Sequence, residues 1–435
     1  MNRKFPLTAW KRVFFILFVL PIFFVYACME KNPSEKTTVR FLTWKPNQPE
    51  VWEEIYHIFE KEYPNISLLR ETGPQSSTAF HDLLTQKLKN KSQDVDVFFM
   101  DVVWPPEFAS AGWAEALDGY FPEEDRQKFL KAPILANTYG GHIWGIPLFI
   151  DSGVLFYRKD LLNRYGFNPP ERWEHLVDQA ERIMSEESDR GFALTGYSGQ
   201  FKQYEGLVCN MMEFILSHGG HIIDPGTGNA ALDRAPAVDA VTFVRDNVIG
   251  RVGNRGMLTY QESESLDVFT QGRAVFHRNW PYAWQICNDP SRSTIAGKVG
   301  IAKLPHFKGG ESHSTLGGWQ LGISAYSKDK EAAWQFVKFL TSSRIQKLLA
   351  VKSGKAPTRK ALYADPEIIE KNPHFDSLKE VFLTAYPRPR SPLYPSISNV
   401  LQRYFSSALS SYDSPVQQEA SEATKQIDHF IALTK

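Results

Sequence analysis

The sequence predicts an α/β protein of two lobes, the first of them built on a parallel, doubly wound sheet. Segments of strand character alternate with amphipathic helical segments between residues 39 and 102. After a change of pattern at residues 142–162, apolar residues at helical spacing predominate. With 435 residues, the chain is long enough to bury two separate cores.

The first residues predict an export signal rather than part of the fold. A basic start precedes an apolar run at 13–27, which is short for a membrane span. The run ends in "VYAC" and resembles a bacterial lipobox, which implies cleavage before Cys28 and attachment of lipid to its sulfur. We therefore expect a signal peptide (1–27), a polar tether (28–38) and an exported lipoprotein, anchored to a membrane on its periplasmic or cell-surface side. An uncleaved N-terminal anchor with an incidental cysteine is the alternative.

The first lobe is expected to begin with a strand–helix–strand–helix–strand pattern. The third strand is a continuous apolar run between polar ends, which is typical of a strand buried on both faces. Ligands of doubly wound sheets bind beyond the carboxyl ends of the strands, and Asp101 lies at such an end. The expected strands are 39–44, 65–71 and 95–102, and the expected helices are 50–64 and 77–90.

Residues 142–162 predict a crossover into a mostly helical second lobe. A strand interrupted by Gly and Pro is followed there by a second strand and a helix. Residues 298–305 are expected to form the strand that returns to the first lobe. We expect the first lobe to comprise 39–147 and 306–355, and the second 148–305 and 356–435. Helices are expected at 171–184, 204–217, 236–249 and 330–342 and again from 376, with a short strand and an aromatic loop within 269–284.

Composition and motifs argue against several classes of function. Lys+Arg and Asp+Glu both number 49, so the charge gives no reason to expect nucleic acid. No phosphate-binding glycine loop, G-x-S-x-G or H-E-x-x-H motif is present, and we expect no metal and no cofactor. "HGGH" (218–221) is better explained by a helix end and a turn than by a metal site. For Cys209 and Cys287 we favour two buried thiols over a disulfide.

Carboxylates and aromatic rings recur where predicted strands end. Sugar hydroxyls donate hydrogen bonds to carboxylates and accept them from guanidinium groups. The C–H faces of a sugar lie flat on aromatic rings. This mixture therefore favours a carbohydrate ligand. Asp101 and Asp151 could instead form the acid/base pair of a secreted glycoside-acting enzyme. The residues are Asp101 with Trp104, Phe149 with Asp151, Trp280 with Tyr282, and Trp319 after two glycines.

Several long motifs resemble the extracellular solute-binding proteins (family 1) of carbohydrate ABC importers, most closely their trehalose/maltose-binding branch. The resemblance implies a type II, maltose-binding-protein-like periplasmic-binding-protein fold, whose two α/β lobes are joined by a hinge of crossing segments and close on the ligand. The motifs are "DVDVFFMDVVWPPEFASAGWAEALD", "GIPLFIDSGVLFYRKDLL", "QYEGLVCN", "RNWPYAW", "STLGGWQLGIS" and "PRPRSPLYP".

The resemblance also implies a non-enzymatic, monomeric receptor that passes an α-linked disaccharide, such as trehalose or maltose, to the transmembrane subunits of a permease. Relatives often carry tyrosine at the position of Phe149. Because a hydroxyl contact is then missing here, the resemblance does not determine which sugar is bound. Gly317 and Gly318 are expected to let the sugar approach the backbone. The implied ligand-binding residues are Glu50 (or Gln48 in its place), Asp101, Phe149, Asp151, Tyr204, Trp280, Gly318, Trp319 and Arg388.

Overall fold

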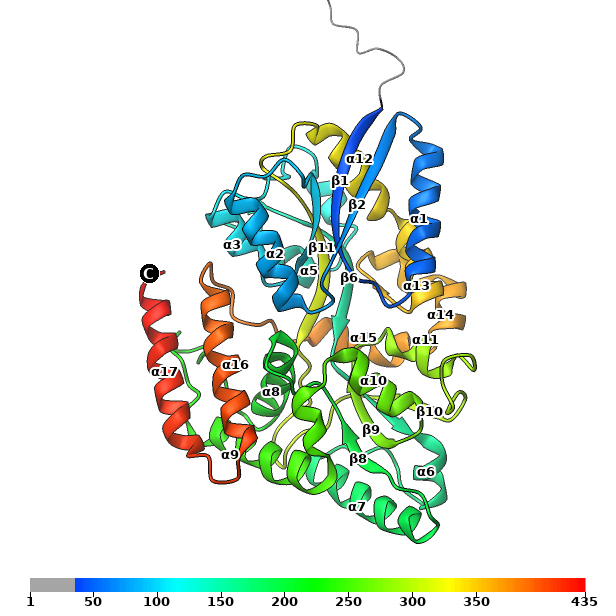
Figure 1. Cartoon of the computed structure of the whole chain (residues 1–435), viewed down its shortest axis with the longest axis vertical. Helices are drawn as coiled ribbons and strands as arrows, with labels where there is room; N and C mark the ends of the chain where they lie inside the picture. Colours follow the sequence, from blue (N-terminus) through cyan, green and yellow to red (C-terminus); the bar gives the residue numbers. More distant parts are fainter. Residues whose placement is uncertain (1–35, 435) are drawn as a thin grey trace, which may run out of the picture. The chain divides into compact units, whose positions relative to one another are not determined.

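The structure, a computed structural model, describes residues 36–434. The predicted signal peptide, Cys28 and most of the expected tether lie outside the described residues. The first strand begins at Thr37, within the range expected for the tether. Two sheets organise the described chain, one of six strands and one of four. In Figure 1 the first sheet lies in the upper half of the molecule and the second in the lower half.

The six-stranded sheet has the order β12-β6-β11-β3-β1-β2. The strand β1 pairs parallel with β2 and β3, as predicted. The sheet is nevertheless mixed, because β11 runs antiparallel to β3 and β6, and β12 runs antiparallel to β6. The reason is that β11 arrives from the second lobe and enters the sheet at the edge where β3 ends. The strands are β1 (Thr37–Trp44), β2 (Ile66–Gly73), β3 (Val97–Asp101), β6 (Ile146–Ser152), β11 (Leu316–Ile323) and β12 (Ala356–Pro357).

Helices pack on this sheet through apolar faces. In α1, for example, Val51, Ile55 and Phe59 recur at helical spacing and are buried. The predicted helices at 50–64, 77–90 and 330–342 are confirmed as α1, α2 and α12. The helices are α1 (Pro49–Glu62), α2 (Ser77–Lys89), α3 (Pro105–Ser110), α4 (Glu123–Arg126), α5 (Lys131–Ala136), α12 (Lys330–Leu340), α13 (Ser343–Ser353), α14 (Pro366–Lys371) and α15 (His374–Thr384), with a 3₁₀ turn at Lys360–Ala364 and a small hairpin of β4 (Thr138–Tyr139) and β5 (His142–Ile143).

The four-stranded sheet has the order β10-β7-β9-β8. The strand predicted at 298–305 exists as β10, but its predicted return to the first lobe is wrong. It pairs antiparallel with β7, and residues beyond it still bond to the second lobe, where the Phe307 amide donates to the Ser217 carbonyl. The chain therefore returns later, through β11. The strands are β7 (Val154–Arg158), β8 (Thr195–Ser198), β9 (Ala274–Asn279) and β10 (Val299–Ala302).

The second lobe is mostly helical, as predicted. The helix α8 is buried along its whole length and lies against α16, which in turn packs on α17 (Figure 1). The helix expected at 236–249 is α-helical only to Phe243 and continues as a π-helix. The helices are α6 (Lys159–Arg164), α7 (Trp173–Asp189), α8 (Glu205–Ser217), α9 (Ala235–Phe243), the π-helix Val244–Val252, the 3₁₀ helix Arg255–Thr259, α10 (Glu262–Thr270), α11 (Ala283–Asn288), α16 (Tyr394–Ser410) and α17 (Val416–Ala432).

Three segments cross between the lobes and form the predicted hinge. The first joins β6 to β7 at Gly153, the second leads into β11 at Ser314, and the third passes Tyr386. The Ser314 hydroxyl donates to the Gly153 carbonyl (2.7 Å), and the Tyr386 amide donates to the Ser314 carbonyl (2.8 Å). The six-stranded sheet includes residues 148–152 and 356–357, which the expected boundaries assign to the second lobe. The lobe boundaries themselves stay a prediction.

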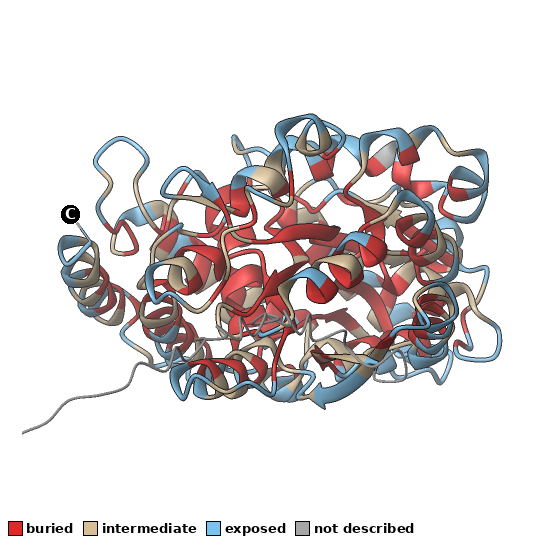
Figure 2. Cartoon of the chain, turned by 90° about the horizontal axis from the view of Figure 1, so that it is seen from above, coloured by how far each residue is buried: buried red, intermediate tan, exposed pale blue. Residues whose placement is uncertain are grey.

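The structure also accounts for the cysteines and for the "HGGH" segment. Cys209 and Cys287 are free, buried thiols, as favoured. The helix α8 ends just before "HGGH", and Gly219 turns the chain with φ +86°. Within residues 36–434 no cluster of His, Cys, Asp or Glu could hold a metal ion, and no helix has the length and apolarity to cross a membrane. Figure 2 shows the inner strands buried beneath helices with exposed outer faces, whereas the edge strand β2 is largely exposed.

Candidate ligand-binding site

The directions of the strands bring the predicted residues to one edge of the six-stranded sheet. The strand β6 runs in the same direction as β3, because both are antiparallel to β11. Their carboxyl ends therefore meet there, which is where ligands of α/β sheets bind. The register pairs Trp319 with Asp101 on one side, and Gly317 with Asp151 on the other. Both predicted carboxylates thus lie beside the "GGW" segment.

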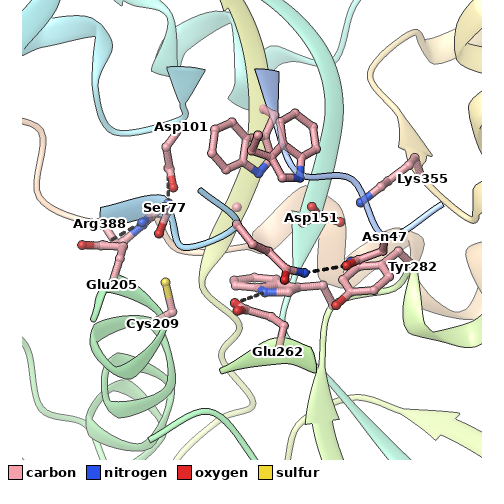
Figure 3. Close-up of a pocket in the computed structure, with 17 residues that line it drawn as sticks. Asn47, Ser77, Asp101, Asp151, Glu205, Cys209, Glu262, Tyr282, Lys355 and Arg388 are labelled. Carbon is pink, nitrogen blue, oxygen red and sulfur yellow. Dashed lines mark hydrogen bonds and ion pairs between the residues drawn. The ribbon is translucent and has the colours of Figure 1, made fainter. Parts of the chain in front are cut away.

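A cavity between the two lobes opens at this edge (Figure 3). Its volume is about 90 Å³, below the roughly 300–1,000 Å³ of typical small-molecule sites. The cavity as it stands is therefore small for a ligand of two sugar rings. The lining comprises Trp44, Asn47, Gln75, Ser77, Asp101, Asp151, Gly317, Gly318, Trp319 and Lys355 from the first lobe, Glu205, Gly206, Cys209, Glu262, Trp280 and Tyr282 from the second, and Arg388 from the third crossing segment.

Arg388 links the two lobes across one side of the cavity. Its guanidinium donates to Asp101 Oδ1 (2.6 Å) and to Glu205 Oε1 (2.7 Å), and all three side chains are buried (Figure 3). The hydroxyls of Tyr394 and Ser398 also donate to the Glu205 carboxylate. Glu205 belongs to the first turn of α8, where the helix dipole favours an acid. One cation thus faces two carboxylates from different lobes.

Asp151 and Lys355 are two further titratable residues that line the cavity. Burial raises the pKa of Asp151 to about 6, although the nearby Lys355 and Arg278 oppose this shift. Burial also lowers the pKa of Lys355. The Lys355 ammonium lies 4.6 Å from the ring centroid of Phe149 and 4.4 Å from that of Tyr282, distances typical of cation–π contacts. Phe149 is itself buried and does not line the cavity.

Two tryptophans border the cavity from opposite lobes. The Trp280 indole N–H lies 3.3 Å from Glu262 Oε1 and donates to it. Trp319 stacks on Trp44 of the same sheet. Hydrogen-bonding carboxylates and partly exposed ring faces therefore converge on one space. This arrangement suits a ligand that carries both hydroxyl groups and apolar faces.

In the structure, close packing around Gly317 and Gly318 provides a reason for glycine that was not expected from the sequence. Gly318 has φ +129°, and a Cβ there would lie 2.6 Å from the Phe149 carbonyl oxygen. A Cβ at Gly317 would lie 3.1 Å from the Trp280 ring. A side chain at 318 is thus excluded by the neighbouring strand, whereas one at 317 would require the Trp280 ring to shift slightly. Both glycines nevertheless line the cavity.

Some predicted residues are not brought to the cavity. Glu50 is exposed in the first turn of α1, and the Gln48 amide donates to the Lys352 carbonyl. Asn47 occupies the cavity in their place. Tyr204 is buried beside the cavity, and burial raises the pKa of its hydroxyl, while the next two residues along the chain form the lining.

The sequence reasoning also missed several lining residues. Glu205 carried a signal, because an acid in the first turn of a predicted helix lay within the quoted "QYEG". Of the others, Trp44 ends the strand predicted at 39–44 and Cys209 lies within α8, while the rest lie in loops or at helix ends. The others are Trp44, Asn47, Gln75, Ser77, Cys209, Glu262 and Lys355.

A second polar cavity adjoins the first. Its volume is about 470 Å³, and it shares Ser77 and Glu205 with the first cavity. The Glu205 amide donates to the Thr78 hydroxyl (3.2 Å), so α2 and α8 of the two lobes meet where the cavities adjoin.

Comparison with known proteins places this geometry in a family context. The profile described as "Bacterial extracellular solute-binding protein" matches residues 38–347. A probable ABC transporter-binding protein of Deinococcus radiodurans is 38% identical over 338 residues, 77% of this chain and 79% of that protein. A maltotriose-binding protein of Pyrococcus abyssi is 24% identical over 353 residues, 80% of this chain and 72% of that protein. The maltose-bound MalE3 structure of T. maritima has a TM-score of 0.83 and 37% identity, and the match covers 91% of this chain and 100% of MalE3.

Proposed function

Because this chain belongs to the bacterial extracellular solute-binding proteins, we propose that it is the sugar-binding receptor of an ABC importer. The observation that carries the proposal is the cavity between the lobes, where carboxylates and aromatic rings from both lobes converge. Carboxylates bind hydroxyls through charge-assisted hydrogen bonds, and indole faces cover the apolar C–H faces of a sugar. The site residues in this proposal are Asp101, Asp151, Trp280, Trp319 and Arg388, with Gly318 contributing backbone.

The ligand we propose is an α-linked disaccharide such as maltose or trehalose. Two observations on similar proteins support this class: MalE3, which covers nearly the whole described chain, is bound to maltose, and a more distant relative is a maltotriose-binding protein. A sugar that matches poorly leaves buried charged groups of the site without partners, which lowers its affinity. The choice between disaccharides therefore depends on few polar contacts.

Capture would proceed by closure of the lobes about the three crossing segments. Asp101 and Glu205 come from different lobes and share Arg388, so a sugar that hydrogen-bonds to this group engages both lobes at once. The closed, loaded form is then the one that the permease subunits recognise. We propose that the receptor acts as a monomer.

Isothermal titration calorimetry tests the proposal. The panel comprises glucose, maltose, trehalose and maltotriose, the last because a second polar cavity adjoins the first. We expect one α-linked disaccharide to bind with a stoichiometry of one, and Trp280→Ala to weaken it by about ten- to a hundredfold through loss of a stacking face. Absence of heat with every sugar, under conditions where the protein is folded, would contradict the proposal.

We propose that the protein binds its sugar without cleaving it. Incubation with maltose and trehalose, followed by an assay for glucose, separates this from a glycoside-acting enzyme that uses Asp101 and Asp151. We expect no glucose above that of a protein-free sample. Turnover that disappears in Asp101→Asn and Asp151→Asn would establish the enzyme instead.

Finally, we propose that a lipid on Cys28 holds the receptor at the membrane. Only a thiol can accept the lipid in this way, so Cys28→Ser should move the protein from the membrane fraction to the soluble fraction. Several acyl chains bury far more CH₂ groups than one, which makes such anchoring stable. Equal membrane retention of the serine variant would contradict the lipobox interpretation.

A further inference from the structure

A buried ion pair lies directly beneath the hinge. Arg278 of β9 donates to both oxygens of Glu213 of α8, at 2.8 Å from Nε and 2.5 Å from the terminal nitrogen. The two side chains are 1% and 2% exposed. Burying such a pair requires removing two charges from water, and apolar residues of similar volume are often as stabilising. Packing alone therefore does not explain why the pair is ionic.

The Glu213 end of the pair contacts two of the three crossing segments. The Thr315 amide, in the segment that leads into β11, donates to Glu213 Oε1 (3.1 Å). At Gly153, between β6 and β7, there is no space for a Cβ, because Glu213 Oε1 and the Arg278 guanidinium occupy it. Movement of the crossing segments would therefore disturb the carboxylate.

The Arg278 end of the pair contacts Trp280, which lines the cavity. Its guanidinium carbon lies 4.0 Å from the centroid of the Trp280 ring, a cation–π distance. The Gln200 side chain holds the arginine as well, accepting from its guanidinium (3.3 Å) and donating to its carbonyl (2.9 Å). Trp280 lines the cavity and donates to Glu262. Arg278 thus contacts one face of the Trp280 ring, and the same ring lines the cavity.

We propose that Arg278 is a positioning residue for Trp280, and that Glu213 couples this ring to the crossing segments at Gly153 and Thr315. The inference rests on the proposed function, because it assigns Trp280 to the sugar. A sugar on Trp280 stabilises one orientation of Arg278, and Glu213 transmits that preference to the hinge. The coupling links occupancy of the site to closure of the lobes.

A double-mutant cycle in maltose binding tests the proposal. Removing only one charge would leave the other unpaired in the interior and could unfold the protein, so the pair is replaced together as Arg278→Met with Glu213→Leu. We expect maltose affinity to fall by about tenfold or more when Trp280 is present. In a Trp280→Ala background the same replacement should change affinity by less than about twofold, because the ring it positions is absent.

A matched control comes from the same sheet. Arg158 of β7 pairs with Asp160 (2.7 Å) and donates to the Gly272 carbonyl, away from the cavity. Arg158→Met with Asp160→Leu should leave maltose affinity within about twofold of the parent. Equal losses of affinity with and without the Trp280 ring, or no loss in either background, would overturn the proposal.

A second measurement needs no sugar, so it separates this proposal from the proposed function. With 5-fluorotryptophan incorporated, the ¹⁹F resonance assigned by Trp280→Phe should shift or broaden in the paired replacement, while the Trp173 resonance should not. The Thr315 amide, deprived of its buried acceptor, should exchange with deuterium at least about tenfold faster. An unchanged Trp280 resonance together with unchanged Thr315 exchange would overturn the coupling even if maltose binds; both changes without maltose binding would support the coupling and contradict the proposed ligand.

Discussion

Trp319 stacks on Trp44 with ring centroids 4.7 Å apart and planes inclined by 17°. Phe80 and Trp104 meet the same indole edge-on, at 6.0 and 5.7 Å. One face of Trp319 is therefore committed to the first lobe, while the side chain remains partly exposed and lines the cavity. The residue therefore packs within the first lobe and also faces the cavity.

Trp319→Ala should weaken sugar binding and stability at once. We expect a loss of about 1–3 kcal/mol in binding, or ten- to a hundredfold in affinity, from the lost ring face. The free energy of unfolding of the ligand-free protein should fall by about 1–3 kcal/mol, since the stack on Trp44 disappears. Calorimetry and urea denaturation measure the two effects.

Trp173→Ala is the matched control for this variant. Trp173 is buried in the second lobe against Phe214, with centroids 4.0 Å apart, and does not line the cavity. Its truncation should cost about 3–5 kcal/mol of stability and leave sugar affinity unchanged. If Trp319→Ala behaves in the same way, Trp319 has a packing role only.

The Arg388 group predicts an asymmetry between single and paired replacements. Arg388→Met leaves Asp101 and Glu205 buried without their cation, which should lower the free energy of unfolding by about 3–5 kcal/mol. Adding Asp101→Asn removes one uncompensated charge and should restore part of the loss. Urea denaturation measures the free energy of unfolding of each variant. If the losses of the two single replacements simply add in the double variant, the two charges do not interact.

The raised pKa of Asp151 predicts the sign of a pH effect. The folded state releases this proton at a pKa of about 6 rather than the ordinary 3.8, so the contribution of Asp151 to stability is complete below about pH 4. It is lost as the pH rises through about 6, by roughly 3 kcal/mol at most. Relative to Asp151→Asn, the parent should therefore lose stability between pH 4 and 7, as measured by denaturation at each pH.

Asp118→Asn supplies a control of opposite sign. Burial alone would raise the pKa of Asp118, but hydrogen bonds from Arg126 and His142 lower it overall. Relative to this variant the parent should gain stability as the pH rises through the acidic range. The Asp151 interpretation fails if both comparisons slope in the same direction.

Cys209 offers a reporter of lobe closure. Its side chain is buried in the lining of the cavity, and burial raises the pKa of the thiol, so it should react with maleimide only when the lobes separate. In a variant whose other cysteines are serine, saturating maltose should slow the reaction by about tenfold or more. In the converse variant, which keeps Cys287 and has serine at the other two positions, the reaction should not respond to maltose, because Cys287 is equally buried but lies outside the lining. Equal protection of both thiols would indicate general stabilisation rather than closure.

Site residues that lie at the ends of strands could be predicted from the sequence. Asp101 and Asp151 could be placed because apolar runs identify buried strands, and the carboxyl ends of such strands meet at one edge. Trp280 could be placed in the same way, because it follows a predicted short strand, whereas Arg388 came from the family resemblance alone. Lys355 and Glu262 could not be found, because each reaches the cavity from the border of a helix and a loop, and only tertiary packing decides its direction.

The predicted return of the chain through β10 was wrong, and the packing around Gly318 was not foreseen, for a similar reason. The strand β10 was expected to lead back to the first lobe, because its apolar pattern does not say which strand it pairs with; its partner β7 belongs to the second sheet, and the chain returns only later. At Gly318 the sequence did not show that a Cβ would meet the β6 backbone, which is a second reason for glycine beside the predicted approach of a ligand. In both cases the local pattern was right and the neighbour was not encoded locally.

A crystal structure of the protein with maltose tests the central claim most directly. We predict one sugar between the lobes, with a ring against Trp280 and hydroxyls on the Asp101 and Arg388 side chains, in a cavity larger than the present one of about 90 Å³. An unaltered cavity without sugar at saturating maltose, or maltose bound only on the outer surface of one lobe, would contradict the account.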